Sequence, residues 1–451
     1  MTSGAPPVTA APVVSLTGVV DVTVPVGVRV VAVRRPSVPM VQLRLHVPLE
    51  GLRISDAAVL AVLPKALMAG SGDRSASEVA AAAQRIGAFI GTSADFDHIG
   101  VWASAPSHEL GEVLAQMADV LARPAFPARD VAGERERVVQ DILQESADPL
   151  STAGRALDER LFPRHPYSDP LPSVSAVRRT GPSALARFHQ RCVVIPGSVL
   201  AVVGDLEPAR VADLVEEAFG RWPLQPAPSP SAVPGQPQVD GAAASRPSDE
   251  RAITVIHRPG AVQSNVRVGT RCASRHHDEF AALQLAVTVF GGNFSSRLVA
   301  NLRERNGYTY TPRAAITEHR HATSLAVAAD VSTSVTAPAL MELDYELARI
   351  ATLPVGEDEL EAARRYVTGM LAMATATQSG LASMLGRVVA YGLEPAYLER
   401  YARQLAEADV HAVQAAAARY LGPAAMSTVV LGDAEAVAPQ LEPLGAVRVR
   451  G

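Results

Sequence analysis

Residues 34–45 read RRPSVPMVQLRL, and residues 257–268 read HRPGAVQSNVRV. From position 41 to 47, apolar residues alternate with polar ones, which is the period of a strand with one buried face. The second stretch has Pro259 where the first has Pro36, again just ahead of apolar residues. A segment that recurs in this way predicts two copies of one structural unit.

Two further matches keep the same order and nearly the same separation along the chain. LARPAFPARDV has Pro124 where IATLPVGEDEL has Pro354, and VLAVVGD ends at Asp205 where STVVLGD ends at Asp433. Isolated matches between apolar strands arise easily by chance, but three in one order at one separation do not. The chain is therefore predicted to be a tandem repeat.

The domain organisation follows from a change in composition between the halves. Residues 223–250 are rich in proline, alanine and serine and have almost no apolar periodicity, which is typical of a semi-rigid linker. We expect an N-terminal domain over 1–222 and a C-terminal domain over 251–451. Pairs of strands followed by runs of helix indicate an α+β fold, with two similar domains. Each would be a mostly antiparallel sheet with helices packed on one face.

Local signals place several elements within the halves. Strands are predicted over 88–94, 98–104, 308–316 and 322–331. Apolar residues at helical spacing predict a helix over 110–121 behind a Ser107 N-cap. Ser75 and Glu78 have the spacing of a capping box at the start of another helix.

Composition limits the classes of function. The chain has 451 residues, 48% of them apolar, and a net charge of −5, so it lacks the basic surface that binding to nucleic acid needs. Cys192 and Cys272 are too few for a disulfide framework or a cysteine metal site. Without a long apolar run, we expect no membrane association and a cytoplasmic location.

Several motifs together resemble one known family. They are residues 70–142, the HPYSDPL run at His165, the VLAVVGD strand, and GGNFSSRLVANLRERNGYTY at 291–310. In order and spacing they are similar to pitrilysin/insulinase-type zinc metallopeptidases, which include the mitochondrial processing peptidase. The resemblance covers nearly the whole chain outside the linker.

The resemblance implies a metal site that this chain has lost. Active members carry His-x-x-Glu-His just before the glycine turn, and those positions here are Ala61, Pro64 and Lys65. Alanine offers no ligand, proline has no carboxylate, and a lysine ammonium repels a dication. The family's third ligand, a glutamate on a later helix, is best matched by Asp141. We therefore expect no cofactor in this chain and a zinc ion in a partner subunit.

The remaining histidines offer little for a metal. No two of the eleven histidines are three or four residues apart, so no helical His pair exists. His276–His277, at a helix start, and His319-x-His321, on a strand, remain as candidate ligand pairs without a convincing third ligand. Solvated surface histidines are the favoured interpretation.

The resemblance also assigns a role to Arg303 and Tyr310, which lie across a helix end at Gly307. In active enzymes the corresponding arginine and tyrosine hold the substrate backbone and the developing oxyanion. A phenol donates one hydrogen bond and a guanidinium supplies charge with several fixed donors. The alternative from the residues alone is a surface arginine paired with a nearby glutamate and a half-buried strand tyrosine.

These features predict a zinc-less subunit of a heterodimeric metalloendopeptidase, inactive alone. The partner would be a similar-length paralogous subunit with an intact His-x-x-Glu-His motif, and Arg303 and Tyr310 would complete its active site. The substrate would be a peptide, for leader-peptide or other peptide processing. Two alternatives stay open: a structural subunit resembling the core proteins of respiratory complexes, and a peptide-binding module without proteolysis.

Overall fold

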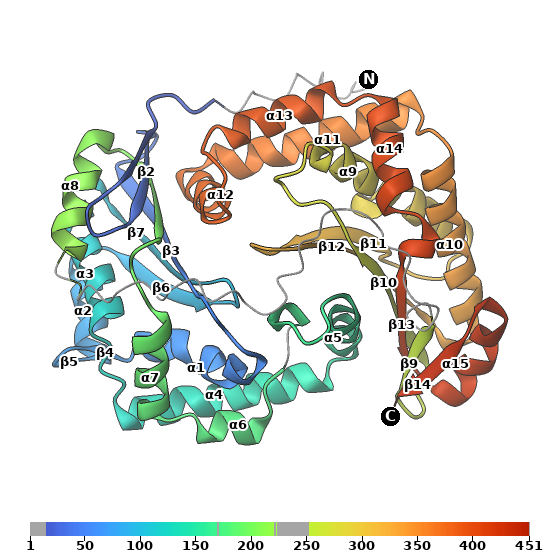
Figure 1. Ribbon diagram of the computed structural model, residues 1–451, viewed down its shortest axis with the longest axis horizontal. Helices are drawn as coiled ribbons and strands as arrows, with labels where there is room; N and C mark the ends of the chain where they lie inside the picture. The colour runs from blue at the N-terminus through green and yellow to red at the C-terminus, as the bar shows by residue number, and fades with distance from the viewer. Residues whose placement is uncertain (1–14, 169–170, 221, 223–251, 451) are drawn as a thin grey trace, which may run out of the picture.

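The computed structural model describes residues 15–168, 171–220, 222 and 252–450. The predicted linker, 223–250, lies outside the described residues. The chain forms two six-stranded sheets, one in each half (Figure 1). The first contains β1 (Val20–Thr23), β2 (Arg29–Arg34), β3 (Met40–Pro48), β6 (Phe89–Ala94), β7 (His98–Pro106) and β8 (Val199–Gly204). The second contains β9 (Ile253–His257), β10 (Gln263–Arg271), β11 (Arg313–Glu318), β12 (Thr323–Ser332), β13 (Ser427–Gly432) and β14 (Val447–Arg450). A small hairpin joins β4 (Gly70–Ser71) to β5 (Arg74–Ser75).

The two sheets repeat one topology. Their strand orders are β1-β2-β8-β3-β7-β6 and β14-β9-β13-β10-β12-β11, so β3 corresponds to β10 and β8 to β13. In both sheets the central strand is antiparallel to each neighbour, and one inner pair, β2–β8 or β9–β13, is parallel. One outermost pair differs, because β1 is antiparallel to β2 whereas β14 is parallel to β9, while β6–β7 and β11–β12 are both antiparallel. The predicted α+β fold with two similar, mostly antiparallel sheets is confirmed.

Helices accompany each sheet in the order that the sequence predicts. The first half has α1 (Ala57–Leu67), α2 (Ala76–Arg85), α3 (Leu110–Ala122), α4 (Ala128–Ala147), α5 (Pro149–Leu161), α6 (Val174–Arg179), α7 (Pro182–Cys192) and α8 (Pro208–Phe219). The second half has α9 (Phe280–Val287), the π-helices η5 (Thr288–Gly292) and η6 (Val299–Arg305), α10 (Thr336–Thr352), α11 (Glu357–Ala376), α12 (Gln378–Ala390), α13 (Tyr397–Glu407), α14 (Val410–Tyr420) and α15 (Ala434–Leu441). Short 3₁₀ turns are η1 (Ile54–Asp56), η2 (Ser107–Glu109), η3 (Pro166–Ser168), η7 (Thr333–Val335), η8 (Pro423–Ala425) and η9 (Glu442–Leu444). No helix among the described residues is long and apolar enough to cross a membrane.

The N-termini of the helices show which of the predicted capping residues are correct. The Ser75–Glu78 capping box is present, with the Ser75 side chain accepting from the Glu78 amide. The Ser107 cap was wrong, because Ser107 opens the 3₁₀ turn η2 and α3 starts after Glu109 without a side-chain cap. Both free cysteines are buried.

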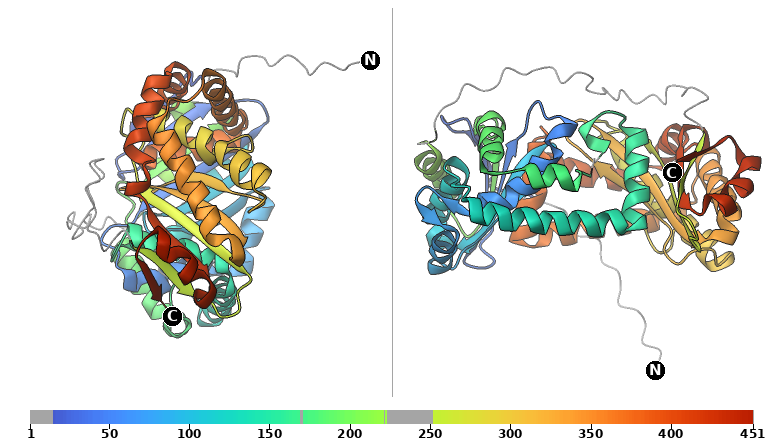
Figure 2. Two further views of the ribbon diagram at one scale, coloured as in Figure 1. Left: turned by 90° about the vertical axis from the view of Figure 1, so that its right-hand side faces the viewer. Right: turned by 90° about the horizontal axis from the view of Figure 1, so that it is seen from below.

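One helix of each half packs against the sheet of the other half. Helix α12 of the second half packs on β3 and β8, and α5 of the first half packs on β10 and β13 (Figure 1). Figure 2 shows α4 running from the first half toward the second, where α5 follows it. Each sheet therefore has its own helices on one face and a helix of the other half on the opposite face. The prediction of helices on one face was incomplete in this respect.

Polar contacts hold the exchanged helix α12 in place. Arg44 on β3 donates from Nε to Ser383 Oγ at 2.9 Å and from Nη2 to Ser379 Oγ at 2.7 Å. At the start of the helix, the Gln378 amide donates to the carbonyls of Arg35 and Val38 at 2.7 and 3.0 Å. These bonds satisfy polar groups that the contact between the halves would otherwise bury without partners.

A second tie joins two hairpin turns, one from each half. Asp97, in the turn between β6 and β7, accepts hydrogen bonds from the Tyr167 hydroxyl and from the Arg320 amide, the latter at 2.8 Å. Arg320 lies between β11 and β12 and also pairs with Glu50 at 2.9 Å. The halves are thus fixed at both sides of their contact.

The exchanged helices approach the opposing sheets closely, which requires glycine at the crossing points. A Cβ at Gly386 of α12 would lie 2.8 Å from Nε2 of His46 and 3.1 Å from Cβ of Arg44. A Cβ at Gly269 of β10 would lie 2.9 Å from Cδ2 of Leu157 on α5. Both distances are too short for unshifted neighbours, so each contact depends on a missing side chain.

We expect Gly386→Ala to lower the free energy of unfolding by about 1 kcal/mol or more, because the added methyl pushes α12 away from β3. Gly369 is the matched control, since it lies inside α11 and a Cβ added there would meet no atom within 4 Å. Gly369→Ala should stabilise the chain by about 0.5–1 kcal/mol through helix propensity alone. Urea unfolding of the variants checks the opposite signs, and equal effects would contradict the tight crossing.

His46 lies under α12 and is nearly buried. Burial lowers its pKa to about 3, and the His98 ring, whose centroid is 4.6 Å away, adds to this effect. Its Nδ1 has no hydrogen-bond partner among the described residues. The folded chain therefore holds this ring neutral, and protons favour the unfolded chain.

Because the folded pKa of His46 lies below its ordinary value of 6.5, its contribution to stability is complete above pH 6.5 and is lost as the pH falls toward 3. Between pH 7 and pH 5 this single ring should lower the free energy of unfolding by about 2 kcal/mol. His46→Leu should show a correspondingly smaller loss over that range, measured by denaturant unfolding at both pH values. His108→Leu, at a side chain 78% exposed, should keep the wild-type loss.

Candidate functional site

The four positions that the resemblance matches to a metal site lie on two helices that pack together. Ala61, Pro64 and Lys65 are on α1, and Asp141 is on α4. The Lys65 ammonium contacts the Asp141 carboxylate, with 2.6 Å between Nζ and Oδ2. The two positions matched from the sequence are therefore neighbours in space. Both side chains are partly exposed, so the ion pair contributes about 1 kcal/mol or less.

Pro64 lies inside α1 and removes one backbone donor from the helix. Its carbonyl oxygen accepts a hydrogen bond from the Thr92 hydroxyl on the edge strand β6, at 2.6 Å. The helix is held by its apolar side, where Val62, Leu63, Ala66 and Leu67 are fully buried. Packing on this scale outweighs a local defect of about 3 kcal/mol.

The residues at this site do not fit a zinc ion. A cation, the Lys65 ammonium, already contacts the only carboxylate of the four positions. In the part of the chain that the structure describes, no group of three or more His, Cys, Asp or Glu side chains could hold a metal. No chemical step in this chain is therefore assigned to a metal.

The two candidate histidine pairs make other contacts. His276 Nε2 lies 2.9 Å from the carbonyl oxygen of Tyr391, and His277 Nδ1 accepts from the Glu279 amide at 3.3 Å. His319 stacks on Tyr167, with ring centroids 4.2 Å apart. His319 and His321 lie in the turn between β11 and β12, so their placement on a strand was wrong.

We expect the isolated chain to bind no stoichiometric zinc after dialysis, as measured by mass spectrometry of the metal content. The combined variant Ala61→His, Pro64→Glu, Lys65→His and Asp141→Glu should bind one zinc per chain, because it places two histidines one turn apart on α1 opposite a carboxylate on α4. The same variant with Asp141→Ala is the matched control and should bind zinc more weakly. Zinc in the wild-type chain that is lost in His276→Ala or His319→Ala would contradict the assignment.

Arg303 and Tyr310 lie together in the second half. The Cζ atom of Arg303 is 4.5 Å from the Tyr310 ring centroid and equally 4.5 Å from the ring centroid of Phe294. Tyr310 and Phe294 are 75% and 70% exposed. Such contacts contribute about 0.5–1 kcal/mol each at exposed sites. Tyr310 precedes the strand, which starts at Arg313, so its expected strand position was wrong.

The chain reversal at Gly307 brings Tyr310 back to Arg303. Gly307 has a φ of +65°, the left-handed conformation that the sequence predicts for a helix end. Its amide donates to the Arg303 carbonyl at 3.0 Å, and the Tyr308 amide donates to the Leu302 carbonyl at 2.8 Å. The helix end thereby sets the spacing between the two side chains.

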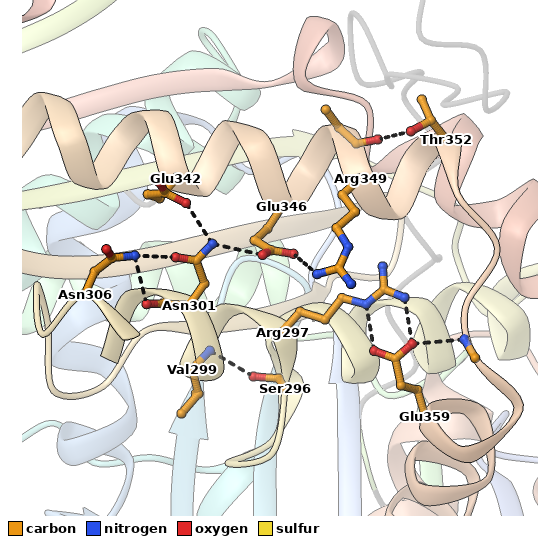
Figure 3. Close-up of polar contacts among 12 residues, drawn as sticks. Ser296, Arg297, Val299, Asn301, Asn306, Glu342, Glu346, Arg349, Thr352 and Glu359 are labelled. Atoms are coloured by element: carbon orange, nitrogen blue, oxygen red, sulfur yellow. Dashed lines mark hydrogen bonds and ion pairs between the residues drawn. The ribbon is translucent and has the colours of Figure 1, made fainter. Parts of the chain in front are cut away.

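A buried polar network fixes the π-helix η6 that carries Arg303 (Figure 3). Arg297, 8% exposed, donates to both carboxylate oxygens of Glu359 at 2.8 and 2.7 Å, and these bonds lower the pKa of Glu359. Asn301, 1% exposed, donates to Glu342 at 2.8 Å and to Glu346 at 2.9 Å. The network binds η6 to α10 and α11. π-Helical turns of this kind are frequent at functional sites.

Sequence reasoning missed Phe294 and the network. Phe294 lies in the turn after η5, and its exposed aromatic ring among small and polar residues was the available signal. In the sequence, Arg297 is distinguished only by the two serines that precede it.

Comparisons with known proteins agree with this fold. The family model described as "Peptidase M16 inactive domain" matches residues 182–367. An uncharacterized zinc protease of Mycobacterium leprae is 26% identical over 419 residues, covering 90% of this chain and 89% of the relative. An uncharacterized zinc protease of Mycobacterium tuberculosis is 27% identical over 425 residues, covering 91% and 92%.

Solved structures share the fold over nearly the full length. The peptidase M16 inactive domain from Pseudomonas fluorescens superposes with a TM-score of 0.80 at 22% identity, covering 92% of this chain and 98% of that one. A protease from Helicobacter pylori gives a TM-score of 0.81 at 17% identity, covering 93% and 100%.

Fold and site thus define a peptidase-like protein without the metal ligands of a working peptidase. The chain is similar to M16-type peptidases and lacks the His-x-x-Glu-His motif at the matched positions, and the predicted resemblance to the pitrilysin/insulinase-type zinc peptidases is confirmed.

Proposed function

We propose that this chain is the non-catalytic subunit of a heterodimeric zinc metalloendopeptidase and that it completes the active site of its partner. The observation that carries the proposal is the contact between the half-buried Arg303 and the exposed Tyr310 in a chain whose ligand positions hold Ala61, Pro64 and Lys65. Half of a hydrolytic site is present, and the metal half is replaced.

The chemistry of the pair suits a site shared with another chain. The partner's zinc would activate water and its glutamate would act as base. Tyr310 would donate its phenolic hydrogen bond to the developing oxyanion, and Arg303 would bind a carbonyl or carboxylate of the substrate. Within the described residues, no hydrogen bond or ion pair links Arg303 or Tyr310 to α1 or α4. This separation supports action on a second chain.

The partner implied is a similar-length paralogous subunit with an intact His-x-x-Glu-His motif. The substrate would be an unfolded peptide, because attack on a backbone carbonyl needs an extended segment at the zinc. Leader-peptide removal is one such reaction. A scaffold that never contacts substrate would not need two large aromatic rings in solvent beside a guanidinium.

Mixing the chain with its zinc-bearing partner should create peptidase activity that neither has alone. Tyr310→Phe removes one hydrogen-bond donor with little change in packing, so it should lower turnover by about 100- to 1,000-fold. Arg303→Ala should lower activity as well, with a larger effect on KM. The measurement is a peptide-cleavage assay on the reconstituted pair.

Tyr345→Phe is the matched control, because Tyr345 is also exposed but lies on α10 outside the pair. It should leave turnover unchanged. Size-exclusion chromatography must show that all variants still assemble. Full activity of both Tyr310→Phe and Arg303→Ala would reject the shared site and favour a structural subunit.

A further inference from the structure

The guanidinium of Arg303 is held by two ring contacts and has one carboxylate, that of Glu304, beside it. Its Cζ atom is 4.5 Å from the centroids of Phe294 and Tyr310, which belong to two different turns on either side of η6 in the sequence. Contacts of this kind use the face of a guanidinium and leave the N–H groups in its plane free. The side chain is thus positioned without its donors being consumed.

The donors of Arg303 are largely unoccupied. Nε lies 3.3 Å from Oε1 of Glu304, whose side chain is 62% exposed. Apart from Glu304, no acceptor among the described residues has a hydrogen bond or ion pair with Arg303. An acceptor that approaches in the guanidinium plane would meet parallel N–H groups, the arrangement that binds a carboxylate through both oxygens.

Side-chain hydrogen bonds hold the helix that carries this group. Arg297 precedes the π-helix and Asn301 lies on it, and their bonds to Glu359, Glu342 and Glu346 hold it against α10 and α11 (Figure 3). A receptor whose parts are held before binding loses little entropy when the ligand arrives. The exposed Phe294 ring adds an apolar surface beside the charged group.

We propose that Phe294, Arg303 and Tyr310 form a receptor for a peptide carboxylate flanked by an apolar residue. The carboxylate, from an Asp or Glu side chain or from a peptide C-terminus, binds the free edge of Arg303, and the apolar neighbour lies on the Phe294 ring. This inference rests on the proposed function in one respect, because it takes the ligand to be a peptide. It adds the chemical class of the ligand and assigns Phe294 as a specificity-determining residue.

The test uses the full chain alone and three matched peptides, titrated by isothermal calorimetry at low salt. The first is acetyl-Ala-Ala-Phe-Asp-Ala-Ala-amide, the second replaces Asp by Asn, and the third is the Asn peptide with a free C-terminal carboxylate. We expect the carboxylate peptides to bind about tenfold or more tightly than the Asn amide peptide, because charge-assisted bonds exceed neutral ones. The stronger of the two carboxylate peptides identifies the source of the carboxylate.

Variants distinguish binding at the proposed receptor from nonspecific attraction of the peptide to positive charge. Arg303→Lys keeps the charge but not the planar fork, and Phe294→Leu keeps an apolar side chain but not the ring, so each should lower affinity about tenfold. Glu304→Gln should raise affinity, since it removes the carboxylate beside Nε. Arg305→Ala is the matched control: Arg305 is exposed on the same helix and should not matter. Circular dichroism confirms that each variant is folded.

Equal affinity for all three peptides, or no binding of any, would overturn the receptor. So would an equal loss in Arg305→Ala and Arg303→Lys, because binding would then follow net charge. These outcomes are distinguishable from failure of the proposed function. The reconstitution assay measures turnover of a cleaved peptide, and turnover depends on Tyr310 whichever ligand group Arg303 binds.

Discussion

The reciprocal contact of α12 with β3 and β8, and of α5 with β10 and β13, is the constraint on which the rest of the structure depends. All six residues of β8 are buried, and seven consecutive residues of β10 are buried as well. Strands buried on both faces need cover on both sides of the sheet. The helices of each half cover one face only. Neither half could therefore bury its sheet completely without the other, although each has its own apolar core.

The exchanged helices also connect the two candidate sites to this contact. Helix α5 directly follows α4, which carries Asp141, and α12 directly follows α11, which carries Glu359. Asp141 pairs with Lys65 at the positions matched to the metal site, and Glu359 pairs with Arg297. The helices that carry these carboxylates are therefore each next in the chain to a helix that packs on the sheet of the other half.

The sequence predicts most of what is local and repeated. The tandem repeat, the Ser75–Glu78 capping box and the left-handed Gly307 were all correct, because they depend on residues close in the chain or on self-similarity. The exchange of helices was not predictable, since apolar periodicity says that a face is buried but not which segment covers it. The strand that was expected to start at Tyr308 starts at Arg313 in the structure. The segment between these residues places the Tyr310 ring against Arg303.

The π-helix η6 shows the same limit at the candidate site. Within it, Asn301 donates to two glutamates of α10 that are far away in the sequence, and no local propensity encodes those bonds. Phe294 was missed for the related reason that exposed aromatic residues carry no periodic signal. Its significance appears only when the fold brings it to the guanidinium of Arg303.

The two candidate sites differ in how their residues contribute to the stability of the fold. At the former metal site, α1 is held by buried apolar side chains and needs only a neutral or paired polar group on its exposed side, which the Lys65–Asp141 pair supplies. At the other site, two exposed rings and a guanidinium with unoccupied donors contribute little to folding, because surface contacts of this kind are weak. Next to them in the chain, Arg297 and Glu346 are buried charged groups, costly to desolvate, that pair with the partly exposed Glu359 and Arg349. Packing and the Lys65–Asp141 pair account for the first site. For the second site, the proposed action of Arg303 on a second chain gives a reason for an arrangement that adds little to the stability of the fold.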